Sequence, residues 1–195
     1  MEPQLGYGDG AERGEGMKEL LLGCGHRRDK DIITPNGKEW HDLTTLDYYE
    51  DAKADVMFDL CSLNHREHGR LPFDTNTFDE VHAYDVLEHI NWQGDFEAMF
   101  YEFGEYYRVL KPDGLFCATV PLSINSIHTW GDPGHRRVIN DLTLVYFSHK
   151  SVMEQLGKTT LTDYLRYLGN TELQTVHYKE GQDRIAFVLR AVKPA

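Results

Sequence analysis

Short apolar runs alternate with turn-forming residues in the first half of the chain. The first run, residues 18–22, is closed by Gly23-Cys24-Gly25, and its length and glycine stop favour a buried strand over a helix. Two further short segments, residues 40–47 and 55–59, each end on an aspartate and are interpreted as strands. A turn-rich stretch precedes residues 78–83, which we predict to be a fourth strand.

A helical period follows these four strands. Between Asp95 and Leu110, large apolar residues recur at intervals of three and four, which predicts an amphipathic helix that stops at Lys111-Pro112-Asp113-Gly114. The continuously apolar segment 115–120 is then a further strand. Strand, helix, turn and strand in this order are typical of a βαβ unit.

The regular pattern is lost after Pro121. Residues 122–150 are rich in His, Asn, Asp and Pro, and we interpret them as an insertion on the substrate side. Helices are expected at 151–156 and 161–168, and two closing strands, 173–178 and 184–192, are spaced for an antiparallel pair. Residues 1–16 contain five glycines and are expected to form a flexible arm before a single domain, residues 17–195.

The net charge of the chain limits the classes of binding partner that we expect. With 20 basic and 32 acidic side chains, the 195-residue chain carries a formal charge of −12, which disfavours nucleic acid and anionic membranes as partners. No apolar run is long enough to span a bilayer, and no secretory signal is visible. Three cysteines do not form a disulfide framework, so a cytoplasmic location is expected. The oligomeric state is not indicated.

Candidate chemistry lies at the ends of the expected strands, because ligands of open α/β sheets bind beyond the carboxyl ends of the strands. A glycine turn there lets a ligand approach the backbone, and an acidic residue about twenty residues later can accept hydrogen bonds from ribose hydroxyls. Gly25 and Asp47 have this spacing. The pattern by itself also fits a nicotinamide dinucleotide, so an oxidoreductase is one alternative.

The absence of a third glycine argues against a nicotinamide dinucleotide as the ligand. A dinucleotide fingerprint needs that glycine to bring a helix N-terminus to the pyrophosphate, whereas here Gly25 is followed by His26-Arg27-Arg28-Asp29 and no glycine recurs until Gly37. A nucleoside cofactor without phosphates does not require that geometry. S-adenosylmethionine is such a cofactor.

Taken together and in order, seven motifs resemble the class I S-adenosylmethionine-dependent methyltransferases, and most closely the small-molecule and glycan type (methyltransferase type 11-like). They cover residues 18–121 and comprise LLLGCG at 20–25, Asp47, DL at 59–60, LPF at 71–73, FDEV at 78–81, DVLEH at 85–89 and RVLKPDG at 108–114. The resemblance implies an α/β Rossmann-like sandwich around a mostly parallel seven-stranded sheet with an antiparallel C-terminal strand. It also implies an enzyme that uses S-adenosylmethionine.

The resemblance further implies roles for the residues at the strand ends. The turn of Gly23, Cys24 and Gly25 would lie against the methionine tail and ribose, and Asp47 would bind the ribose hydroxyls. The pair Asp59-Leu60 would border the adenine, and Asp85-Val86 would line the floor near the sulfonium. The alternative for each aspartate is a helix cap. Leu87-Glu88-His89 is expected to open the next helix and orient this wall rather than contact substrate.

Three departures from the family pattern are visible. Leu21 stands where many members have an acidic residue, so the group that holds the cofactor's ammonium is not evident. Arg27 replaces a common glycine, and Asp113 replaces the first glycine of a PGG turn. The changes at Leu21 and Arg27 keep open a second alternative, a non-catalytic binding module with the same fold.

The acceptor is expected to bind against residues 128–137, which follow the strand ending at Pro121. His135 is the candidate base, His128 the second candidate and Asp132 an orienting partner, for transfer to oxygen or nitrogen of a small-molecule or sugar-like acceptor. The basic rim His135-Arg136-Arg137 suits an anionic substrate. No nucleophile elbow supports a hydrolase. Cys61, His65 and His68 lack a fourth ligand, which favours a solvated loop, and no metal site is predicted.

Overall fold

The protein is built around a mixed seven-stranded sheet. The computed structural model describes residues 16–122 and 127–194, and within them the strand order is β3-β2-β1-β4-β5-β7-β6. Neighbours from β3 to β5 are parallel, and β7 is antiparallel to both β5 and β6. The strands are β1 (Lys18–Leu22), β2 (Asp42–Asp47), β3 (Val56–Met57), β4 (Phe78–Tyr84), β5 (Leu110–Pro121), β6 (Leu173–Glu180) and β7 (Arg184–Ala191). The predicted fold class is confirmed.

The longest helix, α1 (Phe96–Val109), matches the expected amphipathic period. Asp95 caps it by accepting a hydrogen bond from the Ala98 amide. The chain passes directly from α1 into β5, so the expected stop at residues 111–114 lies inside a strand. Asp113 takes up the left-handed backbone conformation there (φ 61°), which aspartate tolerates better than most residues.

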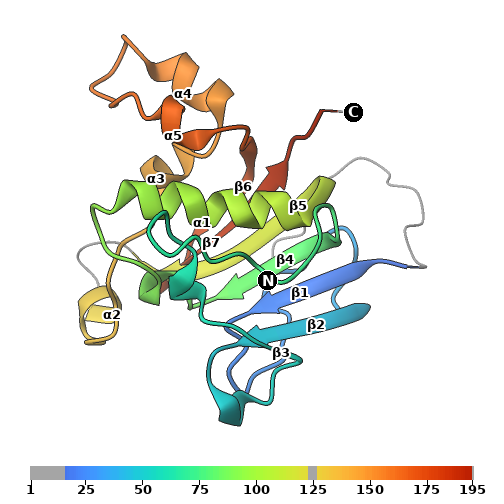
Figure 1. Cartoon of the computed structure of the whole chain (residues 1–195). Coiled ribbons are helices and arrows are strands. Elements are labelled where there is room, and N and C mark those ends of the chain that lie inside the picture. The colour runs from blue at the N-terminus through green and yellow to red at the C-terminus, as the bar shows by residue number, and fades with distance from the viewer. Residues whose placement is uncertain (1–15, 123–126, 195) are drawn as a thin grey trace.

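Four shorter helices (Figure 1) and three 3-10 turns complete the part of the chain that the structure describes. The helices are α2 (Ile127–Trp130), α3 (Asp141–Val145), α4 (His149–Gln155) and α5 (Leu165–Leu168), and the turns are η1 (Glu50–Ala52), η2 (Leu60–Ser62) and η3 (Leu87–His89). The described part of the expected insertion, residues 122–150, therefore contains α2, α3 and the first two residues of α4. Across residues 16–122 and 127–194, no helix combines the length and apolarity that crossing a membrane requires.

One face of the sheet packs against α1 through a large apolar core. Alternate residues of the strands, such as Leu20, Val81 and Phe116, are fully buried against α1 residues such as Phe103 and Tyr106. Each large side chain buried in this way contributes about 1.5 to 3 kcal/mol from the hydrophobic effect. This core fixes the sheet and orients the carboxyl ends of the strands.

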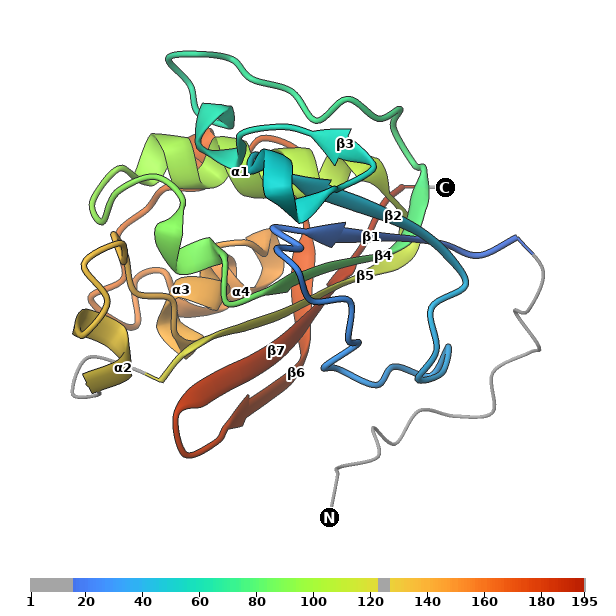
Figure 2. The same ribbon diagram turned by 90° about the horizontal axis from the view of Figure 1, so that it is seen from below.

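The opposite face is covered by irregular chain instead of helices. Residues 23–41, all of which are described, join β1 to β2 without a helix and run on the side of the sheet away from α1 (Figure 2). Ile32 packs there on Cys117 of β5 and Val188 of β7. The strand residues beneath this segment include charged groups as well as apolar ones.

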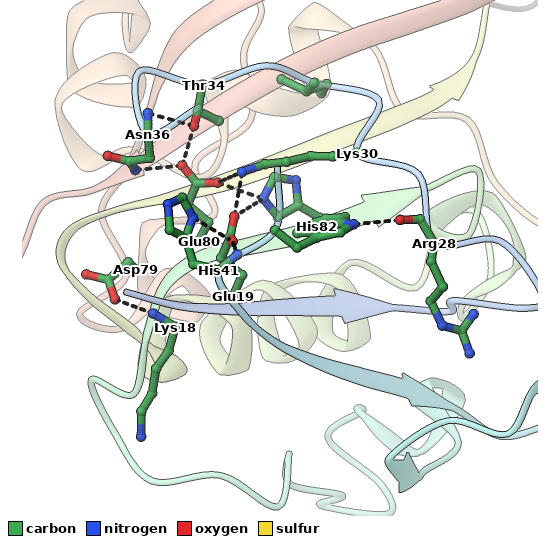
Figure 3. A network of polar contacts seen from close by, with 12 residues as sticks. Lys18, Glu19, Arg28, Lys30, Thr34, Asn36, His41, Asp79, Glu80 and His82 are labelled. Carbon is green, nitrogen blue, oxygen red and sulfur yellow. Dashed lines mark hydrogen bonds and ion pairs between the residues drawn. The ribbon is translucent and has the colours of Figure 1, made fainter. Parts of the chain in front are cut away.

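A buried ionic cluster joins this segment to the sheet (Figure 3). Glu19 of β1 and Glu80 and His82 of β4 are completely buried. The Lys30 ammonium lies 2.5 Å from Glu19 Oε1 and 2.9 Å from Glu80 Oε2. Thr34 and Asn36 donate further hydrogen bonds to Glu80. One lysine from the loop therefore compensates two carboxylates of the sheet.

The protonation states follow from these contacts. Burial alone lowers the pKa of Lys30, but the neighbouring charges of Glu80 and Glu19 outweigh it, so the pKa is raised and the lysine is charged. Burial lowers the pKa of His82 and keeps it neutral. Its Nε2–H can then donate to Glu80, while Nδ1 accepts from the Tyr84 hydroxyl. Every group at the centre of the cluster has a partner.

Lys30→Met tests this cluster. It leaves two buried carboxylates without their cation, and we expect the free energy of unfolding to fall by about 3 to 5 kcal/mol, measured by urea denaturation. Lys38→Met, an exposed lysine of the same loop, is the matched control and should change stability little. Adding Glu19→Gln and Glu80→Gln to Lys30→Met should recover part of the loss. Equal stabilities of Lys30→Met and the wild type would contradict the assignment.

Candidate functional site

A cleft of about 460 Å³ opens at the carboxyl ends of β1, β2 and β4. Its size lies within the range of about 300 to 1,000 Å³ that is usual for ligand pockets. Most of the strand-end residues that the sequence singles out take part in its wall. The lining residues are Gly23, Asp47, Tyr48, Phe58, Asp59, Leu60, Cys61, Asp85, Val86, His89, Ile90, Gly134 and Arg136.

The glycine turn after β1 forms one side of the cleft. Gly23 and Gly25 both have positive φ angles, 58° and 49°. A Cβ atom on Gly23 would lie 2.3 Å from Cγ2 of Val86, whereas one on Gly25 would meet nothing within 4 Å. Cys24 points away from the cleft and is buried with Leu21 and Ala52. The turn therefore presents backbone, and not the cysteine side chain, to a ligand.

Asp47 connects the glycine turn to the end of β2. Its Oδ2 accepts a hydrogen bond of 2.8 Å from the Gly25 amide, and its Oδ1 accepts one of 2.9 Å from the Tyr49 amide. The residue is 7% exposed, and it lines the cleft. Each carboxylate oxygen has a second lone pair, so Asp47 can hold the turn and still accept a hydrogen bond from a ligand.

Arg28 stabilises the turn from the outside. Its guanidinium donates hydrogen bonds to the carbonyl oxygens of Cys24, Gly25, Arg27 and Ala52. The Trp40 indole in turn donates to the Arg28 carbonyl. Apart from the bond to Ala52, these bonds satisfy backbone carbonyls of residues 23–41, a segment without a helix.

Asp85 ends β4 in a strained backbone conformation, with a φ angle of 51°. Its Oδ1 accepts from the Thr119 hydroxyl, and its Oδ2 lies 2.8 Å from Nη2 of Arg184 at the start of β7. Arg184 is separated from Asp85 by about half of the chain, and nothing in the sequence pattern pairs them. The pairing holds the carboxylate at the floor of the cleft.

Asp59 and Leu60, at the start of η2, also line the cleft. Asp59 is the N-cap of η2, and its side chain accepts a hydrogen bond from the Cys61 amide. Asp59 therefore has the helix-capping role that the sequence left open as an alternative. It also lines the cleft. The two roles are compatible because the cap uses only Oδ1.

Beyond Asp85, the chain forms the single turn η3 instead of opening α1. His89, which we expected only to orient this wall, lines the cleft itself. Its ring lies edge-on to that of His135, with the ring centroids 4.7 Å apart. Glu88 is 3% exposed beside them, and its burial raises its pKa to about 7. Two histidines and a buried carboxyl group thus gather at the rim.

A buried ion pair holds this second side of the cleft in place. Arg137 donates to both carboxylate oxygens of Glu102 in α1, at 2.8 and 2.7 Å, and its Nε donates to the Leu87 carbonyl. The amide of Arg136 bonds the Glu88 carbonyl. Residues 135–137 are therefore fixed to both α1 and η3, and His135 is brought beside Glu88.

Arg136 is the cationic member of the lining. Its guanidinium lies over the ring of Trp92, 5.0 Å from the centroid, and contacts Cys61 Sγ. Together with Asp47, Asp59 and Asp85 it gives the cleft three carboxylates and one guanidinium. Of the predicted basic rim, Arg136 lines the cleft, whereas Arg137 is buried in its ion pair with Glu102.

The predicted catalytic residues His128, Asp132 and His135 are not among the residues that line the cleft. His135 is 8% exposed at its side chain, and its Nε2 is 3.9 Å from Asp132 Oδ2. Asp132 is itself exposed and accepts from the Gly134 amide. His128, on α2, is exposed. His65 pairs with Glu97 at 3.2 Å, and the ligand atoms of Cys61, His65 and His68 do not all lie within 4.8 Å of one another.

Comparisons with known proteins identify a family and relatives that this chain resembles. The sequence model of a family described as "Methyltransferase domain" matches residues 20–118. A probable S-adenosylmethionine-dependent methyltransferase of Mycolicibacterium smegmatis is 29% identical over 135 residues, covering 67% of this chain and 49% of that protein. The sterol 24-C-methyltransferase of Kluyveromyces lactis is 30% identical over 113 residues, covering 58% of this chain and 28% of that protein. The chain thus spans half the length of these relatives or less.

Solved structures show the same fold. A crystal structure of a SAM-dependent methyltransferase from Archaeoglobus fulgidus aligns with a TM-score of 0.50 at 13% sequence identity, covering 89% of this chain and 86% of that one. At this identity the likeness concerns the arrangement of the elements.

The glycine turn offers a matched pair of substitutions. Gly23→Ala and Gly25→Ala each place a side chain in the left-handed region, at about 1 to 2 kcal/mol. Only Gly23→Ala also collides with Val86, which adds about 1 to 3 kcal/mol. Urea denaturation should therefore show a larger loss of stability for Gly23→Ala. A larger loss for Gly25→Ala would contradict this account of the turn.

Proposed function

The chain belongs to the methyltransferase domain family, and from that premise we propose that it transfers a methyl group from S-adenosylmethionine to an oxygen or nitrogen of a small-molecule or sugar-like acceptor. The observation that carries the proposal is the cleft at the strand ends, where a glycine turn, Asp47, Asp59 and Asp85 meet. The names of the two relatives specify S-adenosylmethionine in one case and methyl transfer in both. The three free cysteines agree with the reducing cytoplasm that we propose as its location.

The residues of the cleft fit this cofactor. When bound, S-adenosylmethionine supplies an electrophilic methyl group on a positively charged sulfur. Asp47, with unused lone pairs, is suited to the ribose hydroxyls, and the Gly23 turn permits close approach of the methionine portion. Asp59 and Leu60 are suited to the adenine, and Asp85 and Val86 to the region of the sulfonium. Three carboxylates favour a cationic ligand that has no phosphates.

The change at Leu21 has a local structural reason. Its side chain is buried with Cys24 and Ala52 on the face covered by residues 23–41. An acidic residue there would be unpaired, because Lys30 already serves Glu19 and Glu80. Many family members have an acidic residue at the position of Leu21 to hold the ammonium group of the cofactor. We propose that Asp85, at the cleft floor, takes this role here.

The acceptor is proposed to enter beside His89 and His135. Methyl transfer from sulfur is an in-line displacement, so holding the acceptor atom against the methyl carbon in a dry site supplies much of the rate. His135 donates from Nδ1 to the Thr129 carbonyl at 2.7 Å, which leaves a lone pair on Nε2. We propose that this lone pair serves the acceptor, with Asp132 and the more distant predicted His128 as supporting groups at the rim.

Calorimetric titration tests the cofactor assignment. We expect S-adenosylmethionine and S-adenosylhomocysteine to bind, and Asp47→Ala to weaken both by about ten- to a hundred-fold, since a charged hydrogen bond contributes about 1.5 to 3 kcal/mol. Asp51→Ala removes a nearby carboxylate outside the lining and should leave the affinity unchanged. Because Asp47 also holds the glycine turn, circular dichroism must show that Asp47→Ala is folded at the titration temperature.

Two results would count against the proposal. No binding of either compound at submillimolar concentration would overturn the cofactor assignment. Binding without turnover of a methyl-labelled cofactor across hydroxyl- and amine-bearing acceptors would instead favour a non-catalytic binding module. Unchanged affinity in folded Asp47→Ala would overturn the ribose role alone.

A further inference from the structure

Three potential ligand atoms converge at the rim of the cleft. Glu88, His89 and His135 each offer one donor atom, and these atoms all lie within 4.8 Å of one another. His135 Nε2 is 3.8 Å from Glu88 Oε1, which is too far for a hydrogen bond. Glu88 Oε2 is fully buried and has no hydrogen-bond partner in the described structure. A buried carboxylate oxygen without a partner is unusual and indicates a missing cation or donor.

The two histidines are both oriented from behind by backbone carbonyls. His89 Nδ1 contacts the Gly134 carbonyl at 3.1 Å, and His135 Nδ1 contacts the Thr129 carbonyl at 2.7 Å. Carbonyl oxygens only accept, so each Nδ1 carries the hydrogen and each Nε2 carries a lone pair. Metal-binding histidines are held in this way, with the second ring nitrogen donating to a carbonyl or carboxylate.

The backbone around the cluster is arranged for this proximity. A Cβ on Gly134 would lie 3.2 Å from Nδ1 of His89, so the glycine admits the His89 ring. The Arg137–Glu102 pair fixes the segment that carries His135, and the amides of Arg136 and Arg137 bond the Glu88 carbonyl. The three side chains are therefore held together by groups outside the cluster.

We propose that Glu88, His89 and His135 bind a divalent transition-metal ion of the Mn²⁺ or Zn²⁺ kind at the acceptor side of the cleft. Two imidazoles and one carboxylate form a donor set that such ions accept, and imidazole disfavours Mg²⁺ and Ca²⁺. Around a bound ion with bonds of about 2.1 Å, neighbouring donor atoms stand roughly 3.4 Å apart. Side-chain adjustments of about 1 Å bring the present atoms to that spacing.

A second group of this composition, Glu19, Glu80 and His82, differs in the decisive respect. The Lys30 ammonium already occupies the position between its two carboxylates. In the described residues around Glu88, no lysine or arginine side chain is paired with its carboxylate by an ion pair. The cation that completes the group of Glu19, Glu80 and His82 is a lysine of the protein, whereas the cation proposed for Glu88, His89 and His135 comes from solution.

The metal site deepens the proposed function, on which this step rests, by selecting a hydroxyl acceptor. The His135 Nε2 lone pair then acts on the acceptor through the metal ion and not as a direct base. Three protein ligands leave coordination positions open for an acceptor oxygen, and a divalent ion lowers the pKa of a bound O–H group by many units. The hydroxyl then loses its proton to solvent, and its oxygen forms a bond to the methyl carbon. The C–S bond breaks with its electron pair retained on sulfur, which leaves S-adenosylhomocysteine and the methyl ether.

Titration of Mn²⁺ and Zn²⁺ into the metal-free full chain tests the site. Calorimetry, with electron paramagnetic resonance for Mn²⁺, should detect one submillimolar site. His89→Ala and His135→Asn should each weaken it at least tenfold, as should Glu88→Gln. His65→Ala removes a partly exposed histidine that pairs with Glu97 and should leave the affinity unchanged. Circular dichroism of each variant identifies any that does not fold, and His89→Ala, at the cleft surface, is the least disruptive.

The outcomes separate the two proposals. Absence of a submillimolar site for both ions, or equal affinity in His89→Ala and the wild type, would overturn the metal site. Binding of S-adenosylhomocysteine in the same wild-type preparation would then leave the proposed function intact. Metal binding without any binding of S-adenosylhomocysteine would remove the proposed function instead. With both bound, methyl transfer should go to hydroxyl and not amine acceptors and should be abolished by a chelator.

Discussion

The ionic contact between Lys30 and two buried carboxylates is the constraint on which this form of the fold depends. Removing Glu19 and Glu80 from water costs several kcal/mol for each charge unless a cation and hydrogen-bond donors replace the solvent. Lys30, Thr34 and Asn36 provide them from one irregular segment. That segment must therefore cross the sheet face instead of forming a helix along it. Its first residues are the glycine turn of the cleft, so the cluster and the cleft are held by the same stretch of chain.

The acceptor side is secured by the same physical means. Arg137 makes a bidentate pair with Glu102 of α1, and both groups are buried. If the irregular chain after α2 moved away from α1, the Glu102 carboxylate would stay buried without its cation, which is costly. In both places, one basic residue on a non-helical segment meets an acidic residue on a strand or helix. Functional side chains can then sit on loops while retaining fixed positions. Gly23 of the glycine turn and His89 of the histidine cluster both line the cleft for this reason.

Periodicity was sufficient to predict most of the scaffold from the sequence. The strand β1 and the helix α1 have strong local patterns, and the β6–β7 pair follows from spacing. The same strand ends identified Asp47, Asp59 and Asp85, which line the cleft. Contacts between distant residues had no such signal. Glu80 meets Lys30, Asp85 meets Arg184, and His89 meets Gly134, and each pair depends on packing that no local window records. The sequence pattern predicted that β5 begins at residue 115, but the strand begins at Leu110. The difference arises because residues 111–114, which are typical of a turn, lie inside the strand.

The negative charge of the chain has a particular consequence at this cleft. Carboxylates at the strand ends and Glu88 at the rim favour two cations, the sulfonium of the proposed cofactor and the proposed metal ion, and disfavour phosphates. Two cations repel each other, but an acceptor oxygen that has lost its proton is attracted to both. Transfer of the methyl group removes the charge on sulfur and the charge on oxygen together. The product ether then holds the metal more weakly than the reacting oxygen did, so the step that forms the product also loosens it from the site.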